Sequence, residues 1–120
     1  MLPKDTIEIL GFEATRSSLI ARDAPKVERL AYRLRIMGSL ALSLCHLAAG
    51  RLDAVCSLKG ARSVDIAAAQ LLVREVGLAI DLFDDGTPFG AAPLDLDPRS
   101  RVVAAGNREL CAQIAGALSA

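Results

Sequence analysis

Residues 38–50, which read GSLALSLCHLAAG, decide the fold. Gly38 and Ser39 predict a turn followed by a helix, because a serine hydroxyl accepts hydrogen bonds from the free backbone amides of a first helical turn. Residues 40–49 are apolar nearly all round, which is typical of a helix that is buried on every side. Gly50 then ends the predicted helix, since glycine adopts the left-handed cap conformation without strain.

Strand-like and helix-like patterns alternate outward from this helix in both directions. Alternating or β-branched patterns predict strands at residues 6–12, 32–37, 54–58, 78–83 and 101–105. Capping residues predict further helices at about 24–31 after Asp23, at 64–76 after Ser63, and from Asn107 to about 118. This order predicts an α/β layered sandwich: about five strands in a mostly parallel or mixed sheet, flanked by helices. No linker or repeat divides the chain, so residues 1–120 are expected to form one domain.

The composition narrows the function classes. The 120 residues carry 14 basic and 14 acidic side chains, so the balance argues against a dedicated nucleic-acid binder. Aromatic residues make up only 3%, which excludes a stacking platform for single strands. The hydrophobic fraction of 52% and the mean hydropathy of +0.38 predict a folded chain. They also predict that part of its apolar surface is covered by a binding partner.

The cysteines and the hydropathy pattern indicate the cellular compartment in which the protein is expected. Cys45, Cys56 and Cys111 lie far apart in apolar runs, so we expect small core residues with reduced thiols, as in the cytoplasm. Charged residues interrupt residues 1–15, which argues against a signal peptide. No uncharged apolar run reaches 18 residues, which argues against a membrane span. We therefore expect a cytoplasmic protein.

Two predicted helices begin directly after strands, at Gly38-Ser39 and at Ser63-Val64-Asp65. Free amides and the helix dipole make such a terminus a natural phosphate site, although the same residues also serve simply to start a helix. The carboxylate of Asp65 suits a hard cation such as Mg²⁺, or equally the dipole of its own helix. Asp53 is a weaker candidate for a metal ligand, because its position between a predicted helix and a predicted strand is typical of a turn residue.

Basic residues near these two helix starts are candidates for phosphate contact: Arg33, Arg35, Lys59 and Arg62. The alternative is that these basic side chains bind no ligand and are simply exposed to solvent at the edge of the sheet. Phosphate-binding loops, dinucleotide fingerprints and nucleophile elbows are all missing from the sequence.

Residues 38–54, GSLALSLCHLAAGRLDA, resemble the run G-S-A-A-L-x-L-C-x-V-A-x-G-R-x-D-A of the inositol monophosphatase family. Residues 64–77, VDIAAAQLLVREVG, resemble that family's signature W-D-I-A-A-G-x-L-L-V-x-E-A-G-G. The two runs have the family's order and separation, and with the flanking strands they cover nearly the whole chain. The sequence thus resembles the C-terminal half of the family.

This resemblance implies a Mg²⁺-dependent phosphomonoesterase acting on sugar or inositol phosphates, within a layered α/β sandwich that often dimerises. It implies that Asp65 is a metal ligand. It places Gly38, Ser39 and Leu40 beside the substrate, with weaker expectations for Arg35, Lys59 and Arg62.

The departures from the family pattern limit these expectations. The D-P-x-D-G-T motif and the double-carboxylate motif of the N-terminal half are absent from the sequence. Val64 replaces the tryptophan before Asp65, and Leu58 replaces the acidic residue that contacts inositol in the animal enzymes. Residues 58–65 are closer to the archaeal-type branch, whose proteins act on both fructose 1,6-bisphosphate and inositol monophosphate.

A single carboxylate cannot clamp the metal ions of phosphoryl transfer. We therefore assign no catalytic residue and expect no phosphatase activity from the lone chain, with Mg²⁺ bound only in a completed site. The expected partner is a second copy of the chain or the missing N-terminal half. Two other classes stay open: a non-catalytic dimerisation or interaction module, and a metal-independent sugar-phosphate binder.

Overall fold

The computed structural model describes residues 7–13, 17–58, 67–82 and 101–119. Their elements follow one another as β1 (Ile7–Glu13), α1 (Ser17–Asp23), a short 3₁₀ helix η1 (Ala24–Val27), β2 (Ala31–Arg35), α2 (Leu40–Ala48), β3 (Ala54–Ser57), α3 (Ala67–Glu75), β4 (Ala79–Leu82), β5 (Val102–Ala105) and α4 (Arg108–Ser119). Within these ranges, no helix is both long and apolar enough to cross a membrane.

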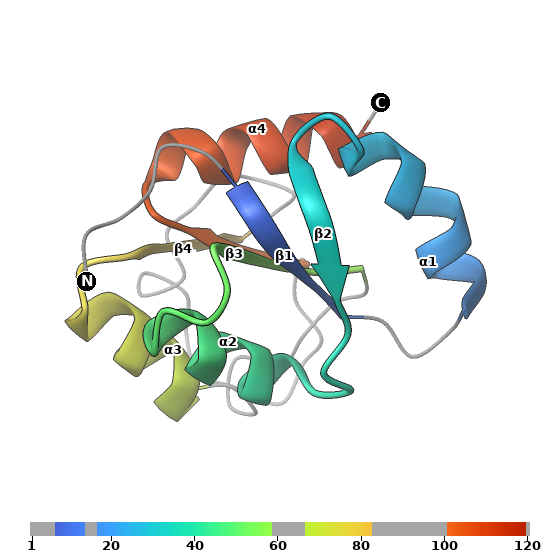
Figure 1. Cartoon of the computed structure of the whole chain (residues 1–120). Coiled ribbons are helices and arrows are strands. Elements are labelled where there is room, and N and C mark those ends of the chain that lie inside the picture. The colour runs from blue at the N-terminus through green and yellow to red at the C-terminus, as the bar shows by residue number, and fades with distance from the viewer. Residues whose placement is uncertain (1–6, 14–16, 59–66, 83–100, 120) are drawn as a thin grey trace.

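The strands form one mixed sheet in the order β2-β1-β3-β5-β4 (Figure 1). Strands β2, β1 and β3 are parallel, with Gly11 opposite Arg35 on one side and Glu13 opposite Ser57 on the other. Strand β5 is antiparallel to both β3 and β4. The predicted five-stranded mixed sheet is confirmed, and three of its strands end at the same edge.

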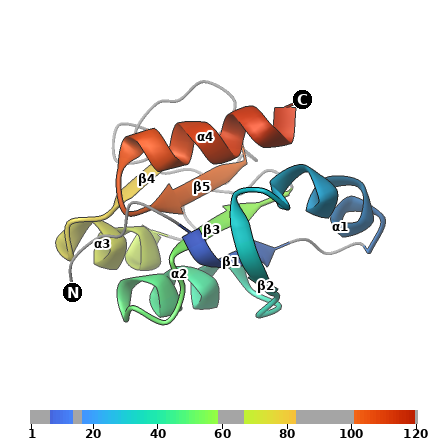
Figure 2. The ribbon, with the colours of Figure 1, turned by 45° about the horizontal axis from the view of Figure 1, so that its top comes forward.

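Helices cover both faces of the sheet (Figure 2). Helices α2 and α3 pack on one face, over a core cluster that includes Leu44, Leu47 and Val73. Helices α1, η1 and α4 lie on the other face, over a cluster that includes Phe12 and Ile114. The crossover from β1 to β2 thus uses one face, and the crossover from β2 to β3 uses the opposite face.

The helix ends follow the sequence closely. The Ser39 hydroxyl accepts a hydrogen bond from the Leu42 amide at 3.2 Å, and the Asn107 side chain does the same for the Leu110 amide at 2.9 Å. Gly50 and Gly77 adopt φ values of +82° and +84° just beyond α2 and α3. These caps confirm the predicted boundaries, because left-handed backbone there favours glycine. The cap predicted at Ser63 lies outside the described residues.

The first helix was predicted in the wrong place. Helix α1 ends at Asp23, where the prediction began a helix, and only η1 covers residues 24–27. Asp23 makes no capping hydrogen bond; its buried carboxylate instead binds Arg22 at 2.7 Å and Lys26 at 3.2 Å. Pro25 has no amide hydrogen, so α-helical bonding cannot pass through it and the chain tightens into a 3₁₀ turn.

Two burial predictions also need correction. Cys56 and Cys111 are buried as expected, whereas Cys45 is exposed on α2. Helix α2 was predicted to be buried on every side, yet its buried residues are Ser43, Leu44 and Leu47 only. The apolar pattern gave the helix correctly, but it could not indicate that the described chain covers just one side of it.

We expect Asp23→Asn to lower the free energy of unfolding by about 2 kcal/mol at pH 7, because it removes charge-assisted hydrogen bonds at a buried site. The hydrogen bond from Arg22 holds the pKa of Asp23 below its usual value. A carboxyl whose pKa is lower when folded adds stability above its unfolded pKa, near 4, and loses it as the pH falls further. The difference between the two proteins should therefore shrink below pH 4.

Urea unfolding followed by circular dichroism at pH 7 and pH 3 measures this difference. Glu28→Gln, at an exposed position in the following turn, is the matched control and should change stability by less than about 0.5 kcal/mol. If Asp23→Asn lowered the free energy of unfolding equally at both pH values, the stabilising role assigned to the charged Asp23 carboxylate would be contradicted.

Candidate functional site

The carboxyl ends of β1, β2 and β3 meet at one edge of the sheet, between the two helical layers (Figure 1). Strand β1 is the point where the chain switches from one face of the sheet to the other, because its neighbours β2 and β3 are reached by crossovers on opposite faces. Open α/β sheets bind ligands at such a switch point, outside the carboxyl ends of the strands. This edge is the candidate site.

Glu13, the last residue of β1, organises this edge. It is only 5% exposed. Its carboxylate accepts hydrogen bonds from the backbone amides of Met37 at 2.9 Å and Gly38 at 3.0 Å, and from the Ser43 hydroxyl at 2.5 Å. One side chain from β1 thus holds both the turn before α2 and the first turns of that helix.

Gly38 and Ser39 are presented to solvent at this edge. Gly38 has φ +83°, a left-handed conformation that turns the chain from β2 into α2. Both residues are exposed, while Leu40 is half-buried against the core under α2. The amides of Leu40 and Ala41 have no acceptor among the described residues, as is usual for a first helical turn. The positive end of α2 therefore faces outward, where an anion would be stabilised.

Of the other predicted contacts, Arg33 and Arg35 lie within the described residues, and both are exposed on β2. The Arg33 guanidinium lies 5.5 Å from the centre of the Tyr32 ring. Arg35 is the last residue of β2, and its guanidinium donates to the Leu34 carbonyl at 3.2 Å. Arg35 therefore ends at the same edge as the Glu13 and Gly38 region. Asp65, Lys59 and Arg62 lie outside the described residues, in the stretch of sequence between β3 and α3. Their roles stay predictions.

Sequence reasoning missed Glu13. The only signal was an acidic residue directly after the strand predicted at residues 6–12. Its partners follow 24 to 30 positions later in the chain, so no local pattern connects them. A buried carboxylate that accepts three hydrogen bonds fixes the geometry of the loop that holds those donors.

The described residues do not supply a magnesium site of their own. No group of three or more potential metal ligands comes together in the ranges that the structure covers. The carboxylates of Glu13, Asp23 and Asp81 are buried and already accept hydrogen bonds from the chain's own groups. Asp53 accepts from the Glu8 and Ile9 amides, each at 2.9 Å, so it holds the start of β1 as a structural residue.

The buried cysteines are also unsuited to chemistry. Burial raises the pKa of the Cys111 thiol to about 12, and it raises that of Cys56 further. Both therefore stay protonated at neutral pH, and a protonated thiol is a poor nucleophile.

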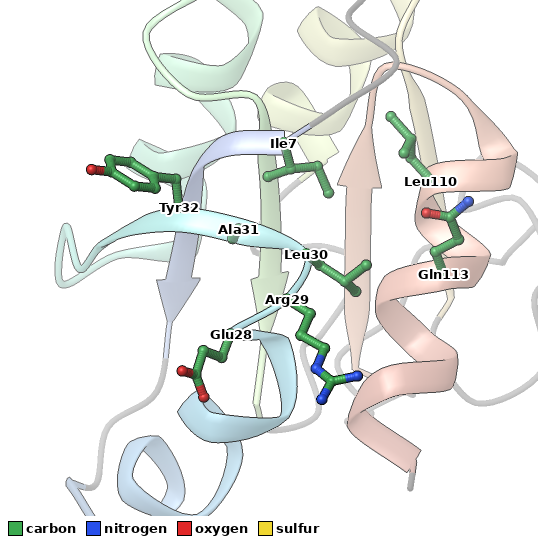
Figure 3. A pocket seen from close by; sticks show the side chains of 8 residues that line it. All are labelled: Ile7, Glu28, Arg29, Leu30, Ala31, Tyr32, Leu110 and Gln113. Carbon is green, nitrogen blue, oxygen red and sulfur yellow. The ribbon is translucent and has the colours of Figure 1, made fainter.

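An open cavity of about 400 Å³ lies elsewhere, between β2 and α4 (Figure 3). Its lining includes Ile7 and Ala31, which pair at the amino ends of β1 and β2, opposite to the candidate site. Its lining residues with polar side chains are Glu28, Arg29, Tyr32 and Gln113. None of the predicted site residues that the structure describes, namely Arg33, Arg35, Gly38, Ser39 and Leu40, lines this cavity.

Comparison with known proteins identifies the fold and the family. The family model described as the inositol monophosphatase family matches residues 7–120. The chain is 40% identical over 90 residues to the fructose-1,6-bisphosphatase/inositol-1-monophosphatase of Methanothermobacter thermautotrophicus, covering 74% of this chain and 31% of that protein. It is 43% identical over 89 residues to human inositol monophosphatase 2, covering 73% of this chain and 28% of that protein.

A solved structure gives the same result. A protein of Pyrococcus horikoshii, described as having similarities to inositol-1 monophosphatase, superposes with a TM-score of 0.71 at 26% identity. The superposition covers 95% of this chain and 43% of that one. The chain therefore spans about a third of the length of these curated relatives and less than half of this solved structure.

Proposed function

We propose that this chain, which belongs to the inositol monophosphatase family, forms the C-terminal portion of a Mg²⁺-dependent phosphatase of inositol or sugar phosphates. The observation that carries the proposal is the outward-facing start of α2 at the carboxyl ends of three parallel strands, held there by buried Glu13. The matched relatives are named for fructose 1,6-bisphosphate and inositol 1-phosphate, which share a phosphate ester on a polyol.

Each residue has a distinct part in the proposed site. Gly38, Ser39 and Leu40 take the substrate phosphate at the positive end of α2, and Arg35, Lys59 and Arg62 add positive charge near it. Asp65 contributes one carboxylate ligand. Mg²⁺, when bound, supplies Lewis-acid stabilisation of the phosphoryl oxygens. Glu13 positions the Gly38 loop and does not contact substrate.

The proposed site needs carboxylates beyond those that these 120 residues supply. Phosphoryl transfer with metal ions requires several carboxylates to hold them, and this sequence contains neither acidic motif of the family's N-terminal half. We therefore infer that the chain is inactive by itself and becomes part of an active enzyme only when that half is present.

Phosphate release from inositol 1-phosphate and fructose 1,6-bisphosphate, with and without Mg²⁺, tests this inference. The purified chain is expected to give none above background. A fusion that places the preceding region of the Methanothermobacter relative before this chain should give Mg²⁺-dependent release. Turnover by the chain alone would contradict the inference, and a folded fusion without turnover would contradict the proposed function.

A non-catalytic dimerisation or interaction module is the second candidate function. It is favoured by the large apolar side chains that the described surface exposes, among them Leu42, Leu71 and Leu72. In this case the chain would form a stable homodimer and bind neither phosphate nor Mg²⁺. Sedimentation equilibrium combined with phosphate titration separates the two candidates. Either function is compatible with reduced thiols and a cytoplasmic location.

A further inference from the structure

The cavity between β2 and α4 has the size of a small-molecule pocket. Its volume is about 400 Å³, within the range of roughly 300 to 1,000 Å³ that is usual for ligand pockets. Three of its lining residues, Ile7, Ala31 and Leu110, are buried apolar side chains. Ile7 and Ala31 pair with each other in the sheet, and the Leu110 amide is bound by the Asn107 cap. The cavity therefore has an apolar floor that the fold holds in place.

Two polar side chains at this cavity have no partner of their own. Arg29 lies in the turn before β2 and Gln113 lies on α4, and neither side chain bonds to another described residue. Arg29 is exceptional in this respect. Every other arginine in the described ranges interacts with another group of the chain. In Figure 3, the Arg29 guanidinium and the Gln113 amide lie on the α4 side of β2, whereas the Glu28 carboxylate and the Tyr32 ring point away from α4.

We propose that this cavity binds a small organic carboxylate with an apolar body. The planar guanidinium of Arg29 donates two parallel hydrogen bonds to the carboxylate, and the Gln113 amide donates another. The hydrocarbon part of the ligand rests on Ile7, Ala31 and Leu110. This site is independent of the proposed phosphatase site, because the cavity lies at the amino ends of β1 and β2 and the candidate site lies at their carboxyl ends.

The lining favours this class of ligand over a sugar or inositol phosphate. A polyol carries hydroxyl groups throughout, and these would lose water against buried apolar side chains without gaining hydrogen-bond partners. Among the described lining residues, Arg29 is the only cation. Its single positive charge balances a carboxylate, but it leaves a phosphate dianion half neutralised, with the Glu28 carboxylate nearby.

Titration of the ¹⁵N-labelled 120-residue chain with 3-phenylpropionate tests the proposal. The largest amide shifts should fall on Leu30, Ala31, Leu110 and Gln113, and they should saturate with a Kd of about 5 mM or less, as expected for a ligand of this size. Two matched compounds separate the two parts of the ligand. 3-Phenylpropionamide keeps the apolar body without the charge, and acetate keeps the charge without the body. Each should bind at least about 5-fold more weakly.

A variant tests the assignment of Arg29 directly. Arg29→Gln should raise the Kd for 3-phenylpropionate at least about 10-fold, because it removes charge-assisted hydrogen bonds. Arg74→Gln is the matched control, since Arg74 is exposed on α3 at the opposite face of the sheet. It should leave the Kd within about 2-fold of the parent value.

Several results would overturn the proposal. Equal Kd values for 3-phenylpropionate and its amide, or for the parent and Arg29→Gln, would show that no carboxylate meets this guanidinium. Inorganic phosphate that shifts the same amides as strongly would remove the requirement for an apolar body. Shifts that do not saturate by about 20 mM would show that no site is present. Shifts of these amides with protein concentration alone would assign the cavity to a second copy of the chain instead.

Discussion

Glu13→Ala is expected to lower the free energy of unfolding by about 3 kcal/mol, which changes the folding equilibrium by about two orders of magnitude. The substitution leaves the amides of Met37 and Gly38 and the hydroxyl of Ser43 without their acceptor at a site that is 5% exposed. Each buried donor left unpaired costs about 1 to 3 kcal/mol, and water entering beside exposed Gly38 recovers part of the sum.

Urea unfolding followed by circular dichroism measures the total loss of stability. Amide hydrogen exchange shows which part of the chain loses protection. Met37 and Gly38 should lose more protection than the core of β3. Glu75→Ala, which removes an exposed carboxylate at the end of α3, is the matched control and should stay within about 0.5 kcal/mol of the parent. A loss below 0.5 kcal/mol for Glu13→Ala would mean that its carboxylate does not hold the loop.

Asp65→Asn is expected to lower the kcat of the completed enzyme by about 10² to 10³. An amide in place of a carboxylate removes one negative ligand from a metal that stabilises transition-state charge, and losses of this size follow when one such contact is removed. The Mg²⁺ concentration at half-maximal rate should rise at the same time. Steady-state kinetics over a range of Mg²⁺ concentrations, on the fusion with the preceding region, measures both effects.

Glu109→Gln, on the exposed side of α4, is the comparison variant and should leave both values unchanged. A kcat for Asp65→Asn within 3-fold of the parent would remove Asp65 from the metal site. The fusion must also unfold at the same temperature with and without the substitution, so that the loss of rate is not a loss of folded protein.

The sequence predicted most accurately the features that depend on residues close together in the chain, such as helix ends. Ser39, Gly50 and Asn107 mark helix boundaries because their caps use backbone groups a few residues away. The alternating order of strands and helices predicted a mixed sheet, and the resemblance predicted the family that the comparison found. The α1 region failed because Asp23 resembles a cap in sequence, whereas in the fold its carboxylate binds Arg22 and Lys26.

What the sequence could not predict depends on contacts between distant segments. Glu13 acquires its role only because parallel pairing brings the end of β1 beside the start of α2. The exposure of Leu42 and Cys45 could not be predicted either. The sequence of a helix that is apolar on all sides does not indicate which of its sides the rest of the chain covers. Composition predicted an apolar surface that a partner would cover. Of the six large apolar side chains exposed among the described residues, four lie on α2, on α3 or just after α3.

Amide chemical shifts of the ¹⁵N-labelled chain, assembled with the preceding region and titrated with inorganic phosphate in the presence of Mg²⁺, test the central claim most directly. Phosphate is the product of the proposed reaction and is not consumed during the titration. The largest shifts should fall on Gly38, Ser39 and Leu40, at the start of α2. Shifts confined to the cavity between β2 and α4, or none at these three amides at saturating phosphate, would contradict a phosphatase site at this edge.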